Sequence, residues 1–200
     1  MSHLNSPFRL DHKTALITGG SKGIGFGIAK SMIQSGARVV ITGRKEATLR
    51  KAAVELGSDT AFRVHDVTDF SHTEQMVQEL MEQIGSIDIL VNNAGNHLKK
   101  PALDTTDDEF NRIIQTHLSG SFSLSRSVAA HMKKNGGGSI LFIASMASYL
   151  AIPKVVAYSA AKSGVLGLVR GLSSELTGFG IRVNAIAPGF IESDMLRNAI

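Results

Sequence analysis

The sequence predicts an α/β fold in which helices cover both faces of a doubly wound parallel sheet. Strand and helix patterns alternate along all 200 residues. The strand patterns are short apolar runs, which are typical of parallel strands buried on both faces. A glycine-rich turn joins the first strand to the first helix, as in folds that bind ligands beyond the carboxyl ends of their strands.

Hydrophobic periodicity predicts each element in order. The expected strands are Ala15–Thr18, Arg38–Thr42, Ala61–Val64, Ile87–Val91, Ser139–Ala144 and Ile181–Ala185. The expected helices are Gly23–Ser35, Glu46–Leu56, a segment that follows Ser71 and stops before Gly85, a long segment from Thr106 toward Lys134, and Val155–Thr177. Ser71 with Glu74, and Thr106 with Glu109, match the capping-box pattern. No linker or repeat divides the chain, so residues 1–200 are expected to form one domain of Rossmann type.

Composition excludes several classes of function. With 43% hydrophobic and 19% charged residues, the chain can bury a full globular core. The absence of cysteine excludes disulfides, thiolate metal sites and cysteine nucleophiles. The net charge is +4, but the cations are interspersed with acids, and two Tyr and no Trp leave little to stack on bases, so no nucleic-acid partner is expected. No secretory pattern or membrane-length apolar run is visible, which predicts a cytoplasmic protein without a membrane partner.

The glycine-rich turn, Thr18–Gly25, predicts a nucleotide site. Glycines permit a tight turn and close approach of the backbone to a pyrophosphate, which the following helix N-terminus stabilises. The expected contacts come from Gly19, Ser21, Lys22, Gly23, Ile24 and Gly25. The spacing Gly-x-x-x-Gly-x-Gly differs from the usual dinucleotide fingerprint and lacks the full Walker pattern. The alternative interpretation is a purely structural turn between a strand and a helix.

The end of the second strand favours NADP(H) over NAD(H). An acidic residue there would bind the ribose hydroxyls of NAD. This chain instead has Arg44, and no acid comes before Glu46. Arg44 and Lys22 are expected to pair with a 2′-phosphate, although solvated surface charges are the alternative.

Tyr158 and Lys162 are the most informative pair in the chain. Four residues apart on a helix, their side chains leave the same face, and a nearby ammonium favours the phenolate. Such a phenol can donate and accept the proton of an alcohol–ketone couple. The pair by itself is weak evidence, since two ordinary helix residues would look the same, but Ser145 lies upstream at the end of an apolar strand pattern.

Together these residues resemble the short-chain dehydrogenase/reductase family. The resemblance covers nearly the whole chain and rests on Thr18–Gly25, Asp66-Val67, Asn92–Gly95, Ser145, Tyr158 with Lys162, and Pro188-Gly189. The segment Ala187–Met195 is most similar to 3-oxoacyl-carrier-protein reductases, with gluconate 5-dehydrogenase-like members next.

The resemblance implies a role for each matched position. Asp66 and Val67 would meet the adenine. Asn92, Ala94 and Gly95 would border the adenosine ribose and hold the sheet. Pro188, Gly189 and Ile191 would contact the nicotinamide amide, while Asn96, His97, Tyr149 and Ile191 would line a pocket for a small-molecule substrate.

The catalytic roles implied by the resemblance belong to three residues. Tyr158 would act as general acid on the substrate oxygen, and Ser145 would hydrogen-bond the same oxygen, with Ser148 as a weaker candidate. Lys162 would lower the pKa of Tyr158 and bind the nicotinamide ribose.

The sequence departs from the family at two places. His117 stands where members usually carry an asparagine that helps to hold a water for a proton relay; the histidine either bonds a water or is an ordinary buried residue. The family also continues through a substrate lid and a seventh strand, which are expected to be absent from a chain that ends at Ile200.

The leading hypothesis is an NADP(H)-dependent oxidoreductase acting on a secondary alcohol or ketone, of 3-oxoacyl thioester or sugar-acid type. The alternative is a non-catalytic NADP(H)-binding sensor or assembly subunit, which His117 and the missing lid favour and the Ser145, Tyr158 and Lys162 set opposes. The resemblance also implies a homo-oligomer, a dimer or tetramer, formed through the two long helices. Gly164, Gly167 and Gly171 on the second of these helices permit close approach but are equally compatible with packing inside one subunit.

Overall fold

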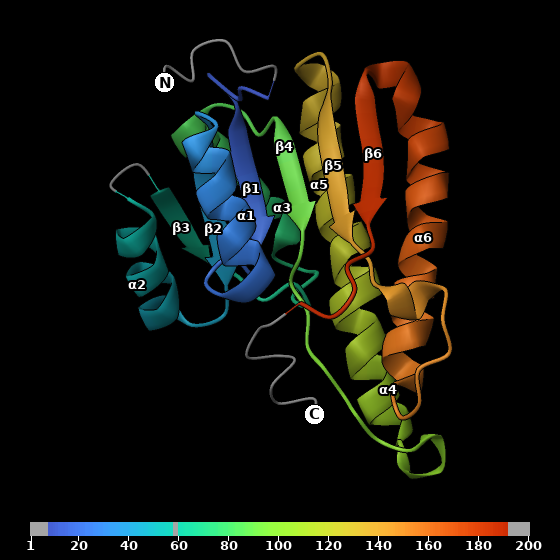
Figure 1. The fold of residues 1–200 in the computed structure, drawn as a ribbon. Helices are drawn as coiled ribbons and strands as arrows, with labels where there is room; N and C mark the ends of the chain where they lie inside the picture. Colours follow the sequence, from blue (N-terminus) through green and yellow to red (C-terminus); the bar gives the residue numbers. More distant parts are fainter. Residues whose placement is uncertain (1–7, 58–59, 192–200) are drawn as a thin grey trace.

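The computed structural model describes residues 8–57 and 60–191 of the chain, and it contains one sheet of six parallel strands. The strand order is β3-β2-β1-β4-β5-β6 (Figure 1). This order confirms the doubly wound, Rossmann-type prediction, because the chain builds outward from β1 in one direction and then from β4 in the other.

Each predicted strand is present, displaced by no more than two residues at either end. The strands are β1 Thr14–Thr18, β2 Arg38–Gly43, β3 Thr60–Val64, β4 Ile89–Asn92, β5 Gly138–Ile143 and β6 Ile181–Ile186. The α-helices are α1 Gly23–Gln34, α2 Glu46–Leu56, α3 Thr73–Ile84, α4 Asp107–Ile114, α5 Gly120–Lys134 and α6 Val156–Leu176. Among the described residues, every helix is too short or too polar to cross a lipid bilayer.

Two expectations about helix ends have different outcomes. The capping box of Thr106 and Glu109 is confirmed, since each residue bonds the other's backbone amide. The capping box of Ser71 and Glu74 is wrong: α3 starts after His72, and the Ser71 hydroxyl donates instead to the Asp69 carboxylate at 2.8 Å.

The long helix predicted from Thr106 to Lys134 contains an irregularity that the periodicity did not reveal. A single π-helical turn, Gln115–Ser119, separates α4 from α5. Such a turn adds a residue to the helical path and is frequent at functional sites. It contains His117, which is buried.

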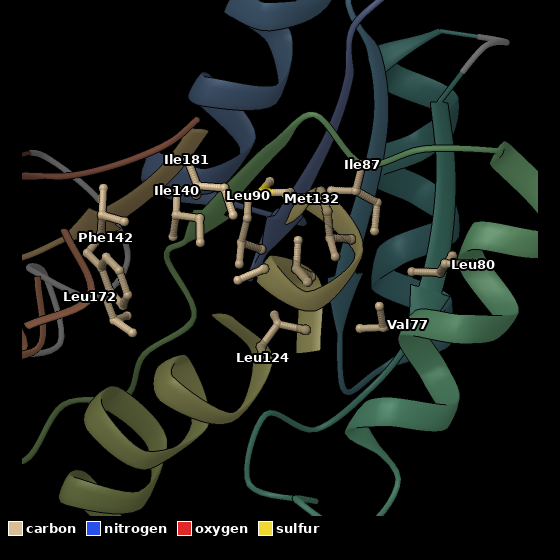
Figure 2. Packing of buried hydrophobic residues seen from close by; sticks show 14 of the residues in the cluster. Val77, Leu80, Ile87, Leu90, Leu124, Met132, Ile140, Phe142, Leu172 and Ile181 are labelled. Carbon is tan, nitrogen blue, oxygen red and sulfur yellow. The ribbon is translucent and has the colours of Figure 1, made fainter. Parts of the chain in front are cut away.

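Two hydrophobic layers hold the sheet between its helices. On one face α3, α5 and α6 contribute to a core that includes Leu90, Ile140 and Phe142 (Figure 2). On the other face α1 and α2 pack over Ile17 and Ile41. The edge strand β6 is covered on one side only within the described residues, because Ile181 and Val183 are buried but the alternating side chains of Arg182 and Asn184 are exposed.

The centre of the sheet is where the direction of winding changes. Strands β1 and β4 are neighbours, with Ile17 opposite Val91, so their carboxyl ends lie side by side. The helices that leave these two ends cover opposite faces of the sheet. In doubly wound sheets, the place where helices diverge in this way is the usual site of ligand binding.

Leu90→Ala is expected to destabilise the fold by about 2–5 kcal/mol, because Leu90 is fully buried in a central strand and its removal leaves a cavity. Urea unfolding followed by circular dichroism measures this loss. The control Val54→Ala, on an α2 position that is 79% exposed, should stay within about 0.5 kcal/mol of the wild type. Equal losses in the two variants would contradict the assignment of the core.

Candidate active site

The glycine turn between β1 and α1 has a backbone geometry and close contacts that favour glycine. Gly19 has a φ of +64°. A Cβ on Gly25 would lie 2.4 Å from both the Gly19 carbonyl oxygen and the Asn93 side-chain nitrogen. The turn is therefore tight, and the N-terminus of α1 follows it directly at Gly23.

Thr18 and Asn93 clamp this turn, which sequence reasoning did not foresee. The Asn93 side chain donates to the carbonyls of Thr18 and Gly19 at 2.9 and 3.1 Å. In return the Thr18 hydroxyl accepts from the amides of Asn93 and Ala94, each at 2.9 Å. The only signal in the sequence was the Asn-Asn doublet at the end of the fourth strand.

The residues predicted to meet the adenosine make local contacts at neighbouring strand ends. The Asp66 carboxylate accepts from the amide and hydroxyl of Thr68, as in a turn after β3. The Val67 carbonyl lies against Gly120 at the start of α5, where a Cβ would be 2.5 Å away. Asn92 donates to Ser125 on α5 at 2.9 Å, so its side chain holds the helix to the sheet. Contacts of these residues with a nucleotide stay predictions.

Lys22 and Arg44 are exposed near the same end of the sheet. The Gly20 amide donates to the Thr42 carbonyl at 3.3 Å, which joins the glycine turn to the end of β2. Each cation lies two residues beyond one of these bonded residues. Across residues 8–57 and 60–191, no ion pair engages either of them.

Lys162 is a buried cation anchored to the sheet. Its side chain belongs to a residue that is 5% exposed, and its Nζ donates to the Ile143 carbonyl at the end of β5, at 2.6 Å. Burial lowers the pKa of Lys162 to about 8, because the ammonium has lost most of its water. The ammonium lies 5.6 Å from the centre of the Tyr158 ring.

Ser145 and Ser148 have different surroundings. Ser145 caps a short 3₁₀ turn, Met146–Ser148, and its Oγ accepts from the Ala147 amide at 3.1 Å. The Ser148 hydroxyl donates to the Lys162 carbonyl at 2.9 Å. Ser148 thus ties the turn to α6, whereas Ser145 is the serine that affects the pKa of Tyr158.

The pKa of Tyr158 does not show the lowering that was expected from Lys162. Burial raises the pKa of Tyr158 above its ordinary value, and the hydrogen bond with Ser145 opposes this rise. Lys162 is not among the groups that shift the pKa of Tyr158; its ammonium is bonded to the Ile143 carbonyl. The expectation of a pKa lowered by Lys162 is therefore corrected for this state of the protein.

The segment predicted to meet the nicotinamide lies beside the Ser145 turn. The Met146 amide donates to the Pro188 carbonyl at 3.0 Å. A Cβ on Gly189 would lie 3.0 Å from the Met146 sulfur, so the two segments are in contact. Ile191, the last described residue, is exposed.

Two histidines border the Tyr158 ring. The rings of His97 and His117 lie edge-on to it, with centroids 5.8 and 5.3 Å away. His97 Nε2, His117 Nδ1 and the Asn96 side-chain oxygen are buried and have no hydrogen-bond partner within residues 8–57 and 60–191. Tyr149, also predicted to line the pocket, is 70% exposed.

These surroundings strongly lower the pKa of the His117 imidazole. Burial, followed by the charge of Lys162, lowers its pKa to about 3. The imidazole is therefore neutral at ordinary pH. Sequence reasoning left this residue outside the catalytic set, and its place beside Tyr158 is visible only in the fold.

The fold and this set of side chains define a class, the oxidoreductases built on a dinucleotide-binding sheet. Residues 13–200 match the model of the short chain dehydrogenase family. The chain belongs to this family.

Several known proteins are similar to the chain over most of their length. The 3-oxoacyl-acyl-carrier-protein reductase FabG of Escherichia coli strain K12 is 38% identical over 185 residues, covering 92% of this chain and 76% of the relative. The 3alpha-hydroxysteroid dehydrogenase of Mediterraneibacter gnavus is 35% identical over 192 residues, covering 94% and 77%. A crystal structure of a gluconate 5-dehydrogenase from Burkholderia cenocepacia in complex with NADP and tartrate superposes with a TM-score of 0.92 at 34% identity, covering 96% of this chain and 76% of the other.

Acid is expected to destabilise the protein through His117. The folded state keeps this imidazole neutral down to about pH 3, while the unfolded one protonates near its ordinary pKa of 6.5. Its contribution is thus complete above pH 6.5 and is lost as the pH falls toward 3, which amounts to about 2 kcal/mol between pH 7 and pH 5. Urea unfolding at both pH values, compared between the wild type and His117→Asn, isolates this part. Identical pH dependence in the two proteins would refute it.

Proposed function

We propose that the chain is an NADP(H)-dependent oxidoreductase that interconverts a secondary alcohol and a ketone, with Tyr158 as the general acid and base. One observation carries the proposal. Ser145 lies close enough to the Tyr158 phenol to lower its pKa, while Lys162, one helical turn further along α6, is fixed to the last carbonyl of β5. Three groups suited to carbonyl chemistry thus meet at the carboxyl end of the sheet.

The glycine turn fits a dinucleotide at this edge. A Cβ at Gly19 or Gly25 would clash with neighbouring atoms, so the turn is compact and its backbone is not covered by side chains at these two positions. The N-terminus of α1 offers free amides to a pyrophosphate. A bound nicotinamide supplies the hydride in reduction and accepts it in oxidation. Lys162 retains donors beyond its bond to Ile143, which suit the hydroxyls of the nicotinamide ribose.

In the reducing direction the chain's own groups manage the charge that grows on the carbonyl oxygen. Ser145 donates a hydrogen bond to that oxygen, and Tyr158 transfers its phenolic proton to it. The raised pKa of Tyr158 keeps the phenol protonated at neutral pH, which suits a proton donor. In the oxidising direction the tyrosine must act as a base, and Ser145, which lowers the pKa of Tyr158 against the effect of burial, favours the phenolate that this requires.

Arg44 and Lys22 support a preference for NADP(H). Both are exposed and without ion-pair partners in the described part of the chain, at the end of β2 and the start of α1. A guanidinium binds phosphate through paired hydrogen bonds, and no acid stands before Glu46 to favour the free ribose hydroxyls. The structure of the similar gluconate 5-dehydrogenase contains NADP.

The substrate is proposed to be a 3-oxoacyl thioester or a sugar acid. The similar proteins include a 3-oxoacyl-acyl-carrier-protein reductase, which is 38% identical to this chain, and a gluconate 5-dehydrogenase, which is 34% identical. The candidate pocket wall contains Asn96, His97, Tyr149 and Ile191, a mixed polar and apolar set.

We further propose that residues 1–200 act as one catalytic domain within a dimer or tetramer built on α5 and α6. On α6, Gly164 packs on Leu118 of its own chain, with a Cβ position 3.0 Å from that side chain. Among the described residues, no atom outside its own helix lies within 4 Å of the Cβ position at Gly171, and Phe122 on α5 is 39% exposed. A second copy packed closely along these helices would cover the surface that contains the small residue Gly171 and the apolar side chain of Phe122.

Tyr158→Phe should lower kcat by roughly 10²–10⁴-fold while NADPH binding is retained, since the proton donor is removed and the ring remains. Stopped-flow oxidation of NADPH with a panel of ketones measures kcat, and NADPH fluorescence measures binding. The control Ser31→Ala removes an exposed hydroxyl from α1, outside the proposed site, and should keep normal turnover. Full turnover by Tyr158→Phe would overturn the assigned acid; a wild-type protein that binds NADPH but oxidises it with no ketone would instead favour the non-catalytic sensor.

Arg44→Ala should raise the Kd for NADPH by about 10- to 100-fold, as expected for loss of a hydrogen bond between charged groups, and leave NADH binding nearly unchanged. Titration with both nucleotides tests this. Lys51→Ala, an exposed cation on α2, is the matched control. Equal weakening of NADPH and NADH would show that Arg44 does not recognise the 2′-phosphate.

A further inference from the structure

His117 lies where three parts of the fold meet. It is 3% exposed, and it belongs to the π-helical turn between α4 and α5. Its ring contacts the strand exit at Gly95 and Asn96, and it also faces Tyr158 on α6. The wider turn gives the backbone the extra residue that carries this imidazole inward.

One ring nitrogen of His117 fixes the strand exit. Nε2 is 2.8 Å from the Asn96 carbonyl oxygen and 3.2 Å from the Asn96 amide nitrogen. Because a neutral imidazole has one N–H, only one of these contacts is a hydrogen bond, and we assign the proton to Nε2 on the shorter distance. Nε2–H then donates to the Asn96 carbonyl, and Nδ1 is an acceptor with no partner in the part of the chain that the structure describes.

The other contact is with Gly95. A Cβ at this position would lie 2.5 Å from His117 Cε1 and 3.2 Å from Nδ1. The imidazole edge therefore occupies the space that any larger residue at position 95 would need. Gly95 and His117 are a matched pair in this chain.

The third contact is with the proposed acid. The His117 and Tyr158 rings are perpendicular, with centroids 5.3 Å apart, an arrangement that aromatic pairs favour. His97 borders the same phenol ring edge-on at 5.8 Å. Lateral movement of the Tyr158 ring would thus require displacement of an imidazole that is itself tied to the strand exit.

We propose that His117 is a positioning residue that locks the Tyr158 ring against the strand exit at Gly95 and Asn96, so that the phenol stays beside Ser145. The catalytic consequence rests on the proposed function; the lock itself does not. Lys162 and His97 are the titratable groups whose charges act on His117, and both are cationic or neutral. A neutral imidazole avoids a further positive charge in this position, which is consistent with its low pKa.

The catalytic part is tested by the kinetics of His117→Leu. We expect kcat to fall about 10- to 100-fold, the size of effect that a misplaced reacting group produces, with the Kd for NADPH unchanged. His131→Leu, on the last turn of α5, is the control and should retain normal kcat. Unchanged kcat in His117→Leu would overturn the catalytic part, because it would show that the Tyr158 phenol keeps its position without the imidazole.

The lock is tested without any turnover by a double-mutant cycle on thermal unfolding. Gly95→Ala should lower the Tm markedly in the wild type but little in a His117→Ala background, where the clash with Cε1 is relieved. Equal decreases in both backgrounds would overturn the lock. Nitrogen-15 NMR provides an independent reading, since His117 should show the Nε2–H tautomer and should not titrate above pH 5. If the wild type reduces no ketone, the proposed function fails while this cycle still decides the lock.

Discussion

The bond from the Lys162 ammonium to the Ile143 carbonyl is the contact on which the arrangement of the site depends. It joins the middle of α6 to the last residue of β5 at 2.6 Å. A buried charge without partners would be costly, and its pKa of about 8 shows that part of this cost persists. The bond ties this face of α6 to the end of β5, and Tyr158, one turn away, leaves the same face of the helix.

Other polar side chains near the strand ends also form hydrogen bonds with the backbone of neighbouring segments. Asn93 and Thr18 exchange hydrogen bonds across β4 and β1, and Ser148 bonds the Lys162 carbonyl. The turns after these strands lack regular backbone pairing, so side chains must satisfy their carbonyls and amides.

Local patterns were sufficient for most of the fold. Apolar runs bounded by glycine predicted the strands, and the Thr106 capping box predicted the start of α4, because these features depend on residues that are near in sequence. The Ser71 capping box failed for a related reason. Asp69 competes for the serine hydroxyl, and a pattern of two residues does not include that competitor. The π turn at Gln115–Ser119 also escaped prediction, since the apolar periodicity passes through it with little change.

The sequence by itself determined the order of strands and helices, the glycine turn and the types of residue available for carbonyl chemistry. Only the tertiary structure decided how these residues act on one another. It directed the Asn92 side chain to α5, fixed the Lys162 ammonium on a backbone carbonyl 5.6 Å from the centre of the phenol ring, and set two histidines against that ring. The physical reason is that hydrogen-bond partners and desolvation depend on distances between segments far apart in the chain, which spacing along a sequence does not contain.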